Sequence, residues 1–278
     1  MNKAEARRQF TELVMKAENE IEPGRAALLI AAEEYPSLDP DTYLAQLDQF
    51  AAEVRAVLPS QTDPLIILLT LNDHLFNQLG FHGNTENYYD ARNSFLNDVI
   101  DRRTGIPITL SVIYLEVARR LGLPVYGVGL PGHFLVRYRD AERDVIIDPF
   151  HAGRVLSVER CQEMFEEMYG GTVKFQLSFL SEVTTKQMLT RMLHNLKGIY
   201  LRVPDYARAL GVIERLLILQ PESPVEIRDR GLASLALGRY TQAQADLESY
   251  LRRVPLGEDV DDIKEKLTEL RRKQARLN

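Results

Sequence analysis

The sequence predicts an α+β domain over residues 1–180 and an all-α domain over residues 181–278. Three observations support this division. Residues 107–121 are apolar on nearly every side of a helix, and short β-leaning segments follow them. Amphipathic helical stretches precede that helix, and a repeat of helical character fills the C-terminal part. The chain has 278 residues, which is enough for two ordinary hydrophobic cores.

Composition restricts the class of protein. Hydrophobic residues make up 45% of the chain and charged residues 27%, which is typical of a globular protein. The net charge of -6 argues against nucleic-acid binding, because phosphate contacts need a basic surface. No apolar run reaches the length of a signal segment or a membrane span, and the single Cys161 excludes an internal disulfide. We therefore predict a cytoplasmic protein with no membrane and no nucleic-acid partner.

The first hundred residues predict a layer of short helices. Helical spacing of apolar residues covers residues 3–17 and 21–34, a third stretch that ends before Pro59, and a fourth that begins at Pro64. Short helices with one apolar stripe each are expected to pack on something larger. A polar and aromatic loop that includes Tyr88 follows them. The next helix is predicted over residues 93–102.

The central helix begins and ends at recognisable signals. Gly105 permits a tight turn, and Pro107 suits the first helical position because its missing N–H needs no partner there. The helix ends at residues 121–124, where Gly122 and Pro124 stop it. Because its apolar residues lie on nearly all sides, we expect it to be buried.

Three short strands are predicted after this helix, at residues 125–130, 134–138 and 145–147. His133 stands at the entrance of the second strand, and Asp148 follows the third. Neighbouring strands would bring these two side chains together as a hydrogen-bonded pair. In a catalytic triad, such a pair consists of a base and the carboxylate that orients it.

Four segments carry a resemblance to a known family: residues 93–96, 103–111, 132–137 and 148–150. They resemble the SirB family of bacterial proteins, in which a transglutaminase-like core of the papain-type superfamily is joined to tetratricopeptide repeats. In such cores a cysteine opens the buried helix, and a histidine and an aspartate follow on adjacent strands. The resemblance implies that core as the fold, with His133 and Asp148 at the positions of the catalytic histidine and aspartate.

The expected nucleophile is missing. Counted back from Gly122, its position falls at Pro107, which has no nucleophilic atom. Cys161 lies beyond Asp148, in a predicted helix over residues 158–169, where a buried structural thiol is the expected state. Two hydroxyl groups remain as alternatives: Thr109, and Ser111, which could instead bond back to the carbonyl of Pro107.

Further candidate pocket residues surround the start of the central helix. The resemblance places Asn93 and Arg103 near it, together with Pro107 itself, and Tyr88 would stand at the rim. Each has a structural alternative: Arg103 could pair with Asp148, for example, and Tyr88 could cover the core.

No cofactor or metal is predicted. His133, Asp148 and His151 could converge, but no helical pair of histidines and no pair of cysteines supports a metal site. The glycines of residues 125–130 lie within a strand and do not open a helix, so they form no phosphate-binding loop.

The C-terminal part repeats with a period of 34 residues. Tyr206, Ala209 and Pro221 recur as Tyr240, Ala243 and Pro255, which is the length and pattern of a tetratricopeptide repeat. The first unit departs from the pattern at Lys197, where a small residue is usual. A last amphipathic helix, residues 260–277, is predicted to cap the array. Such arrays form grooves for a protein or peptide partner, although two units could also only support the first domain.

Two functions remain from these residues. The first is a non-catalytic interaction or regulatory protein, a pseudoenzyme that holds a polypeptide in its repeat groove or in the former substrate cleft. The second is an acyl-transfer or hydrolytic enzyme in which His133 is the base, Asp148 orients it, and Ser111, Thr109 or Cys161 attacks. A hydrogen bond between His133 and one of these three groups would favour the second.

Overall fold

The computed structural model describes residues 1–60 and 62–277. Contacts divide the chain into two compact units, Met1–Met192 and Leu193–Asn278. The division falls inside one helix, α8 (Thr185–Arg202). The boundary expected after residue 180 precedes this helix, and as a limit between independently folding domains it stays a prediction.

The first unit begins with four helices, α1 (Lys3–Val14), α2 (Pro23–Ala32), α3 (Pro40–Val57) and α4 (Pro64–Asn72). The last three begin with proline. The carboxylates of Asp39 and Asp63 accept hydrogen bonds from the free N–H groups of the first turns of α3 and α4. Aspartate caps and N-terminal prolines thus fix where these helices start.

Two helical predictions differ from the structure in this layer. The helix expected to begin at Pro64 and continue to Leu79 changes after Asn72 into a π-helical segment, η2 (Asp73–Gln78). The apolar spacing does not distinguish the two forms, because they differ in backbone hydrogen bonding. The helix expected over residues 93–102 is a 3-10 turn, η3 (Ala91–Asn93), followed by α5 (Leu96–Arg102).

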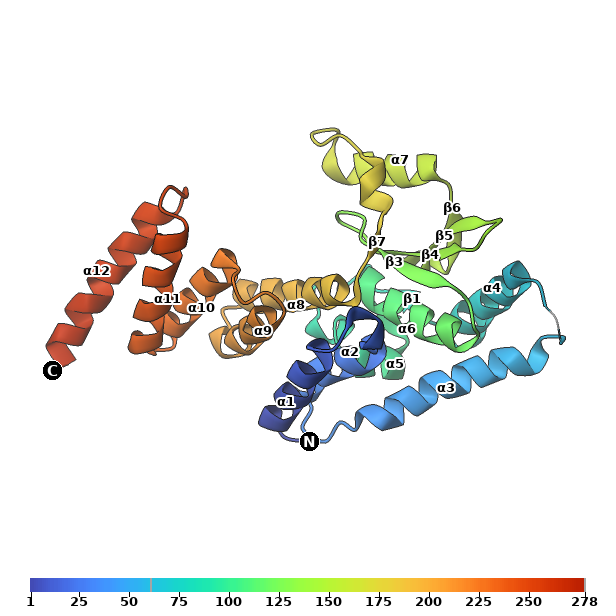
Figure 1. The fold of residues 1–278 in the computed structure, drawn as a ribbon, viewed down its shortest axis with the longest axis horizontal. Coiled ribbons are helices and arrows are strands. Elements are labelled where there is room, and N and C mark those ends of the chain that lie inside the picture. The colour runs from blue at the N-terminus through green and yellow to red at the C-terminus, as the bar shows by residue number, and fades with distance from the viewer. Residues whose placement is uncertain (61, 278) are drawn as a thin grey trace. The chain divides into compact units, whose positions relative to one another are not determined.

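A small antiparallel sheet forms the centre of the first unit, as the sequence predicts (Figure 1). Its strands are β3 (Val125–Val128), β4 (Leu135–Arg139), β5 (Asp144–Asp148), β6 (Arg154–Leu156) and β7 (Glu182–Val183). They lie in the order β6-β5-β4-β3-β7, and every neighbouring pair is antiparallel.

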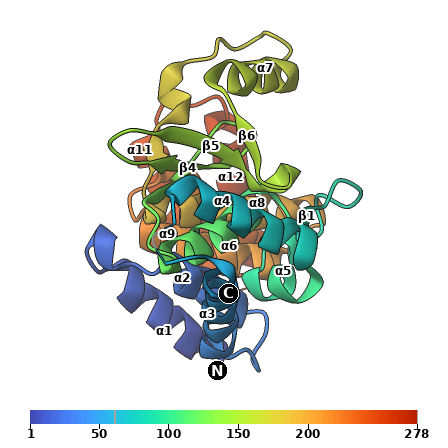
Figure 2. The ribbon, with the colours of Figure 1, turned by 90° about the vertical axis from the view of Figure 1, so that its right-hand side faces the viewer.

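The two faces of the sheet carry different helices. α6 (Pro107–Arg120) packs against β3 and β4 on one face, and its side chains are buried from Pro107 to Ala118. α7 (Val158–Tyr169) lies over the other face, as the two views show (Figures 1 and 2). The prediction of a core helix at residues 107–121 is thereby confirmed. Residues 172–179, expected to lean towards β structure, instead lead into a 3-10 helix, η5 (Leu177–Leu180).

A two-residue parallel ladder lies beside α6. It joins β1 (His82–Gly83) to β2 (Thr104–Gly105). Gly83 is required here, because a Cβ at this position would lie 2.5 Å from the ring of Phe150. Phe150 belongs to a second short turn, η4 (Pro149–His151), which directly follows β5. The ladder therefore supports the segment that carries Asp148.

The second unit consists of the end of α8 and four helices, α9 (Tyr206–Leu219), α10 (Pro224–Ala236), α11 (Tyr240–Arg253) and α12 (Val260–Leu277). The repeated positions Ala209 and Ala243 are both fully buried. Gly231 lets α10 and α11 approach closely, since a Cβ there would lie 2.8 Å from Leu247. Across residues 1–60 and 62–277, every helix is too short or too polar to cross a bilayer.

Candidate functional site

His133 and Asp148 meet as the sequence predicts. Nε2 of His133 lies 2.9 Å from Oδ1 of Asp148, and both side chains are buried. The contact forms because β4 and β5 are antiparallel neighbours, so the residues just before β4 lie beside the end of β5. A second imidazole, that of His151, reaches the other carboxylate oxygen, with Nδ1 2.7 Å from Oδ2.

Asp148 is also a helix cap. Its Oδ1 accepts hydrogen bonds from the backbone N–H groups of Phe150 and His151 in η4, at 3.1 and 3.4 Å. Burial opposes ionisation of this carboxyl, but the hydrogen bonds and charges of His133 and His151 outweigh it. The pKa of Asp148 consequently lies below its ordinary value. The site therefore holds a carboxylate that fixes two imidazoles.

The other ring nitrogen of His133 is available to a ligand. Nε2 is engaged with Asp148, and Nδ1 has no hydrogen-bond partner among residues 1–60 and 62–277. In a catalytic triad the carboxylate holds one nitrogen of the base while the other faces the nucleophile. His133 has the orientation of such a base.

Neither hydroxyl candidate reaches His133. Oγ1 of Thr109 accepts a hydrogen bond from the N–H of Ile106 at 3.1 Å and donates to the carbonyl of Asn93 at 2.8 Å. It closes the first turn of α6 as a cap does. Oγ of Ser111 donates to the carbonyl of Phe134 at 3.4 Å, and not to Pro107 as the sequence had suggested. Both oxygens thus have structural roles.

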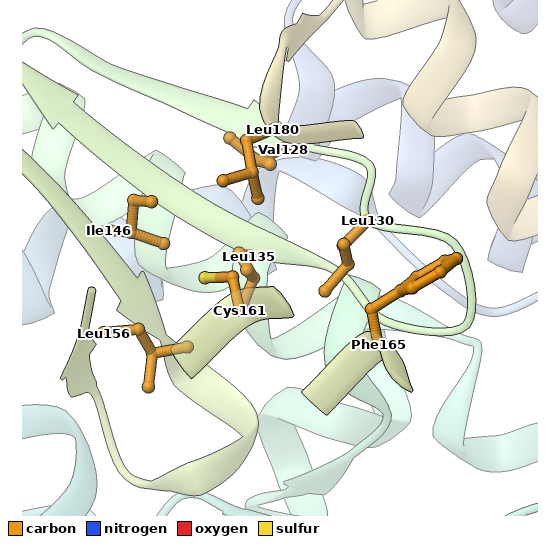
Figure 3. Close-up of a cluster of buried hydrophobic side chains, with 8 residues drawn as sticks. All are labelled: Val128, Leu130, Leu135, Ile146, Leu156, Cys161, Phe165 and Leu180. Atoms are coloured by element: carbon orange, nitrogen blue, oxygen red, sulfur yellow. The ribbon is translucent and has the colours of Figure 1, made fainter. Parts of the chain in front are cut away.

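The thiol of Cys161 lies in an apolar cluster on the α7 face of the sheet. Figure 3 shows it among Val128, Leu135, Ile146 and other apolar side chains. Burial, with a smaller contribution from the charge of Asp148, raises the pKa of Cys161 to about 11. A reactive thiol needs the opposite change, so Cys161 stays protonated at neutral pH. It forms no hydrogen bond with His133.

Pro107 occupies the first position of α6 and is buried. Ser111, one turn later, contacts the carbonyl of Phe134, the residue after His133. The first turns of α6 therefore run beside the histidine strand. That Pro107 stands at the position of the superfamily's nucleophile stays a prediction.

Asn93 and Tyr88 are linked to the site through one loop. The amide of Asn93, which is fully buried, donates to the carbonyl groups of Asn87 and Tyr88 at 2.8 and 3.3 Å. This fixes the loop that carries Tyr88. The ring of Tyr88 meets Phe150 edge to face at 6.4 Å, and Phe150 meets His133 in the same way at 5.9 Å. Tyr88 thus stands one aromatic ring away from the histidine.

Arg103 lies elsewhere. Its guanidinium stacks over the rings of Phe50 and Phe81, 5.0 and 4.8 Å from their centres, and donates to the carbonyl of Ile100. The alternative that Arg103 pairs with Asp148 is wrong. The residue adopts a left-handed conformation, with φ of 58°, as the C-cap of α5. That position directs its side chain into the helical layer.

The geometry of a metal site is present in part. His133, Asp148 and His151 each offer a ligand atom, and these atoms lie within 4.8 Å of one another. Nε2 of His133 and Nδ1 of His151 already hydrogen-bond to the two carboxylate oxygens of Asp148, so the three side chains also form a hydrogen-bonded network. The absence of a metal stays a prediction.

The sequence does not predict how three residues near the site contact it. Phe150 lies in a segment of the family resemblance and His151 is considered only as a metal ligand, but the turn η4 that brings both rings to His133 has no periodic pattern. Arg191 belongs to α8 and lies against the carbonyl of Leu130, 61 positions earlier in the chain. No local sequence pattern can predict a contact between residues so far apart in the chain.

A substitution of Thr109 tests whether its hydroxyl caps α6 or serves as a nucleophile. Replacement by alanine leaves the N–H of Ile106 and the carbonyl of Asn93 without their partner. We expect the free energy of unfolding to fall by about 1–2 kcal/mol. Urea unfolding of Thr109→Ala and Thr109→Ser measures it, and the serine variant should retain most of the stability. Equal losses in both variants would contradict the capping role.

Comparison with known proteins agrees with this architecture. The family model described as transglutaminase-like superfamily matches residues 41–194, and a tetratricopeptide-repeat model matches residues 196–268. No solved structure matches the chain.

Several curated proteins are similar to this chain. A UPF0162 protein of Xylella fastidiosa is 39% identical over 247 residues, covering 88% of each chain. A UPF0162 protein of Haemophilus influenzae is 32% identical over 192 residues, covering 69% of this chain and 72% of its own. F-box only protein 21 of Mus musculus is 40% identical over 138 residues, which are 47% of this chain and 21% of that protein.

The family models cover both compact units, and the bacterial relatives match over most of their length. The expected combination of a transglutaminase-like domain and tetratricopeptide repeats is confirmed. The relatives are named UPF0162 proteins, and the narrower assignment to the SirB family stays a prediction. The chain belongs to the transglutaminase-like superfamily, in the group of UPF0162 proteins.

Proposed function

We propose that this chain is a non-catalytic, polypeptide-binding protein of the bacterial cytoplasm, of the SirB type. Its transglutaminase-like unit keeps the base and the orienting carboxylate but has lost the nucleophile. One observation carries the proposal. His133 is held by Asp148 with Nδ1 left free, while the helix that should present a nucleophile begins with Pro107.

The alternative nucleophiles support the same conclusion. Thr109 is committed to the start of α6, and Ser111 donates to a backbone carbonyl. Cys161 is embedded in an apolar cluster, with a raised pKa. An acyl-transfer mechanism needs an attacking atom within hydrogen-bond reach of the base. None of the three hydrogen bonds to His133, so we infer that the site binds without reacting.

The C-terminal unit supports the recruitment of a partner. Tetratricopeptide repeats commonly mediate protein–protein interactions. A hollow of about 420 Å³ opens on this unit. Its walls are mostly apolar and include Leu201, Tyr206, Leu232, Leu235 and Ala236, with Asp229 and Lys266 beside them. We propose that this hollow receives part of a protein partner.

A reactivity experiment tests the loss of the nucleophile. The full-length protein is treated with iodoacetamide and with a fluorophosphonate, and adducts are located by peptide mass. The wild-type protein should form no adduct that depends on His133. Labelling of wild type at Thr109, Ser111 or Cys161 that His133→Ala abolishes would establish the enzyme instead.

Pro107→Cys is the complementary gain-of-function variant. A thiol at the first position of α6 would stand at a helix N-terminus, which lowers a thiol pKa, and a charged His133 close to it would lower that pKa further. We expect alkylation of this cysteine at pH 6 to be about tenfold faster than that of an unperturbed thiol, because its thiolate fraction is larger. Alkylation at pH 6 that is no slower in Pro107→Cys/His133→Ala would contradict the assignment of His133 as the former base.

Recruitment is tested by affinity capture with the full-length protein. Leu201→Lys places a charge in the hollow, where Leu201 is 37% exposed. Leu256→Lys makes the same change at a site that is 96% exposed and is not part of the hollow's walls. A partner of the repeats should be retained by wild type and Leu256→Lys and lost from Leu201→Lys. Equal retention by both variants would exclude the hollow.

A further inference from the structure

Arg191 stands beside the histidine strand. It lies on α8 and is partly buried, and its Nη1 donates to the carbonyl of Leu130 at 3.0 Å. Its guanidinium also lies over the ring of Phe134, 5.5 Å from the ring centre. Leu130 and Phe134 flank the turn that leads to His133. Gly129 lies next to this group: a Cβ there would be in ordinary contact with the same Nη1 at 3.7 Å, and the glycine is required instead by Val183, whose side chain would lie 2.9 Å from that Cβ.

This guanidinium has no acidic partner among the described residues. Burial lowers the pKa of Arg191, and the ionisable groups that act on it are the phenols of Tyr88 and Tyr169, not a carboxylate. Two arginines of the neighbouring strand β4 are paired, Arg137 with Asp144 and Arg139 with Glu182. A cation removed from water without a counter-charge is costly, because its hydration is lost. Arg191 is therefore a positive charge that lacks its anion.

Arg191 and Tyr88 both approach His133. Arg191 bonds to Leu130 and lies over the ring of Phe134, the residue that directly follows His133. Tyr88 is 37% exposed, and its ring contacts Phe150, which in turn contacts His133. The phenol, the guanidinium and Nδ1 of His133 thus belong to one neighbourhood.

Arg191 and Tyr88 can both donate hydrogen bonds to a ligand. A guanidinium has five N–H groups, and one of them is used by Leu130. The phenol of Tyr88 can donate as well. Four N–H groups remain, and two neighbouring N–H groups of a guanidinium match the two oxygens of a carboxylate, which is the geometry of the strongest such pairs. The rings of Tyr88 and Phe150 offer apolar surface beside it.

We propose that Arg191, with Tyr88, binds a carboxylate of the polypeptide held next to His133. This inference rests on the proposed function, since it names the group by which a held polypeptide is recognised. The carboxylate has two sources, the C-terminus of a polypeptide or an acidic side chain. Both present the same pair of oxygens to the guanidinium, and the experiment separates them.

The test uses the full-length protein and four short peptides. Acetyl-Ala-Phe-Ala is compared as the free acid and as the amide, and acetyl-Ala-Phe-Glu-Ala-amide is compared with its glutamine counterpart. Binding is followed by the Nε–H signals of ¹⁵N-labelled arginine, with that of Arg191 assigned from its loss in Arg191→Gln. We expect one or both carboxylate peptides to shift this signal saturably at millimolar concentration, and neither neutral peptide to shift it.

Matched variants identify the contact. Arg191→Gln should weaken carboxylate binding by about tenfold or more. Arg191→Lys should weaken it less, because lysine keeps the charge but lacks the two parallel N–H donors of arginine. Arg55→Gln is the control, because Arg55 also bonds to a backbone carbonyl but is exposed. It should bind like wild type. Tyr88→Phe should weaken binding while leaving the signal of Arg191 in place.

Three results would overturn the inference. These are a shift caused equally by acidic and neutral peptides, unchanged carboxylate binding in Arg191→Gln, and no shift with any peptide at about 10 mM, a range that would detect even millimolar affinity. A response of the Arg191 signal to inorganic phosphate and to none of the peptides would mean that Arg191 binds another anion, and would also overturn the inference.

A purely structural role of Arg191 predicts a different result: a lower melting temperature for Arg191→Gln and Arg191→Lys, without any selective effect on acidic peptides. A covalent adduct dependent on His133 would remove the proposed function but not the carboxylate site.

Discussion

Replacement of Lys197 by methionine is expected to lower the free energy of unfolding of the C-terminal unit by about 3–5 kcal/mol. Lys197 is 9% exposed, and its ammonium lies 2.7 and 2.9 Å from the two carboxylate oxygens of Glu226 and 2.9 Å from Asp229. Glu226 is 2% exposed. Without the lysine it keeps only the contact with His194, at 3.0 Å, and its buried charge is poorly compensated.

Removal of both partners separates the cost of an unpaired charge from the net contribution of the pair. Lys197→Met/Glu226→Leu should regain much of the loss, because no buried carboxylate remains and Asp229 keeps its bond to Arg228 at 2.8 Å. Lys264→Met is the exposed control, where the pair with Asp261 contributes less than about 1 kcal/mol. Urea unfolding followed by circular dichroism measures all three, since the chain has no tryptophan. A double variant no more stable than the single would contradict this account.

Asp148→Ala should destabilise the first unit by about 3 kcal/mol at neutral pH. The change removes the acceptor of two imidazole N–H groups and of the first N–H groups of η4. His151 can turn to water because it is half exposed, whereas His133 is buried and stays without a partner. Asp148→Asn keeps an acceptor oxygen for His133 and should lose less. Thermal and urea unfolding compare the two variants.

The stabilisation due to Asp148 also has a defined pH dependence. Its pKa in the folded protein lies below the ordinary value near 3.8, so the folded state favours the ionised form. The stabilisation from this ionisation is therefore fully present above the unfolded-state pKa and is lost as the pH falls through the folded-state pKa. The difference in unfolding free energy between wild type and Asp148→Asn should shrink below about pH 4. A difference that grows between pH 5 and pH 3 would show that the carboxyl is protonated in the folded protein.

Much of the fold follows from local signals in the sequence. The helix at residues 107–120 is bounded by Pro107 and Gly122, and its apolar residues on all sides require burial between a helical layer and a sheet. The meeting of His133 and Asp148 could be predicted because both flank strands joined by a short hairpin. The repeat of 34 residues identified the C-terminal helices in the same way.

The details of the candidate site depend on contacts between distant segments. The role of Thr109 depends on its bond to the carbonyl of Asn93, and the role of Arg103 depends on two phenylalanine rings. No local sequence pattern predicts these contacts. Lys197 departs from the repeat pattern because it faces Glu226, 29 residues later. Arg191 contacts Leu130 across 61 residues. Side-chain chemistry at a site thus depends on tertiary partners more than the course of the backbone does.

One continuous helix, α8, supplies residues to both compact units. Met188, Leu189 and Met192 are buried in the first unit, and Leu193 and Leu196 are buried in the second. A fragment ending at residue 180 would lack strand β7 and the three buried side chains of α8 that belong to the first unit. Deletion mapping of this protein should therefore place its cut after α8, or replace single surface residues in the intact protein, so that lost binding is not mistaken for lost folding.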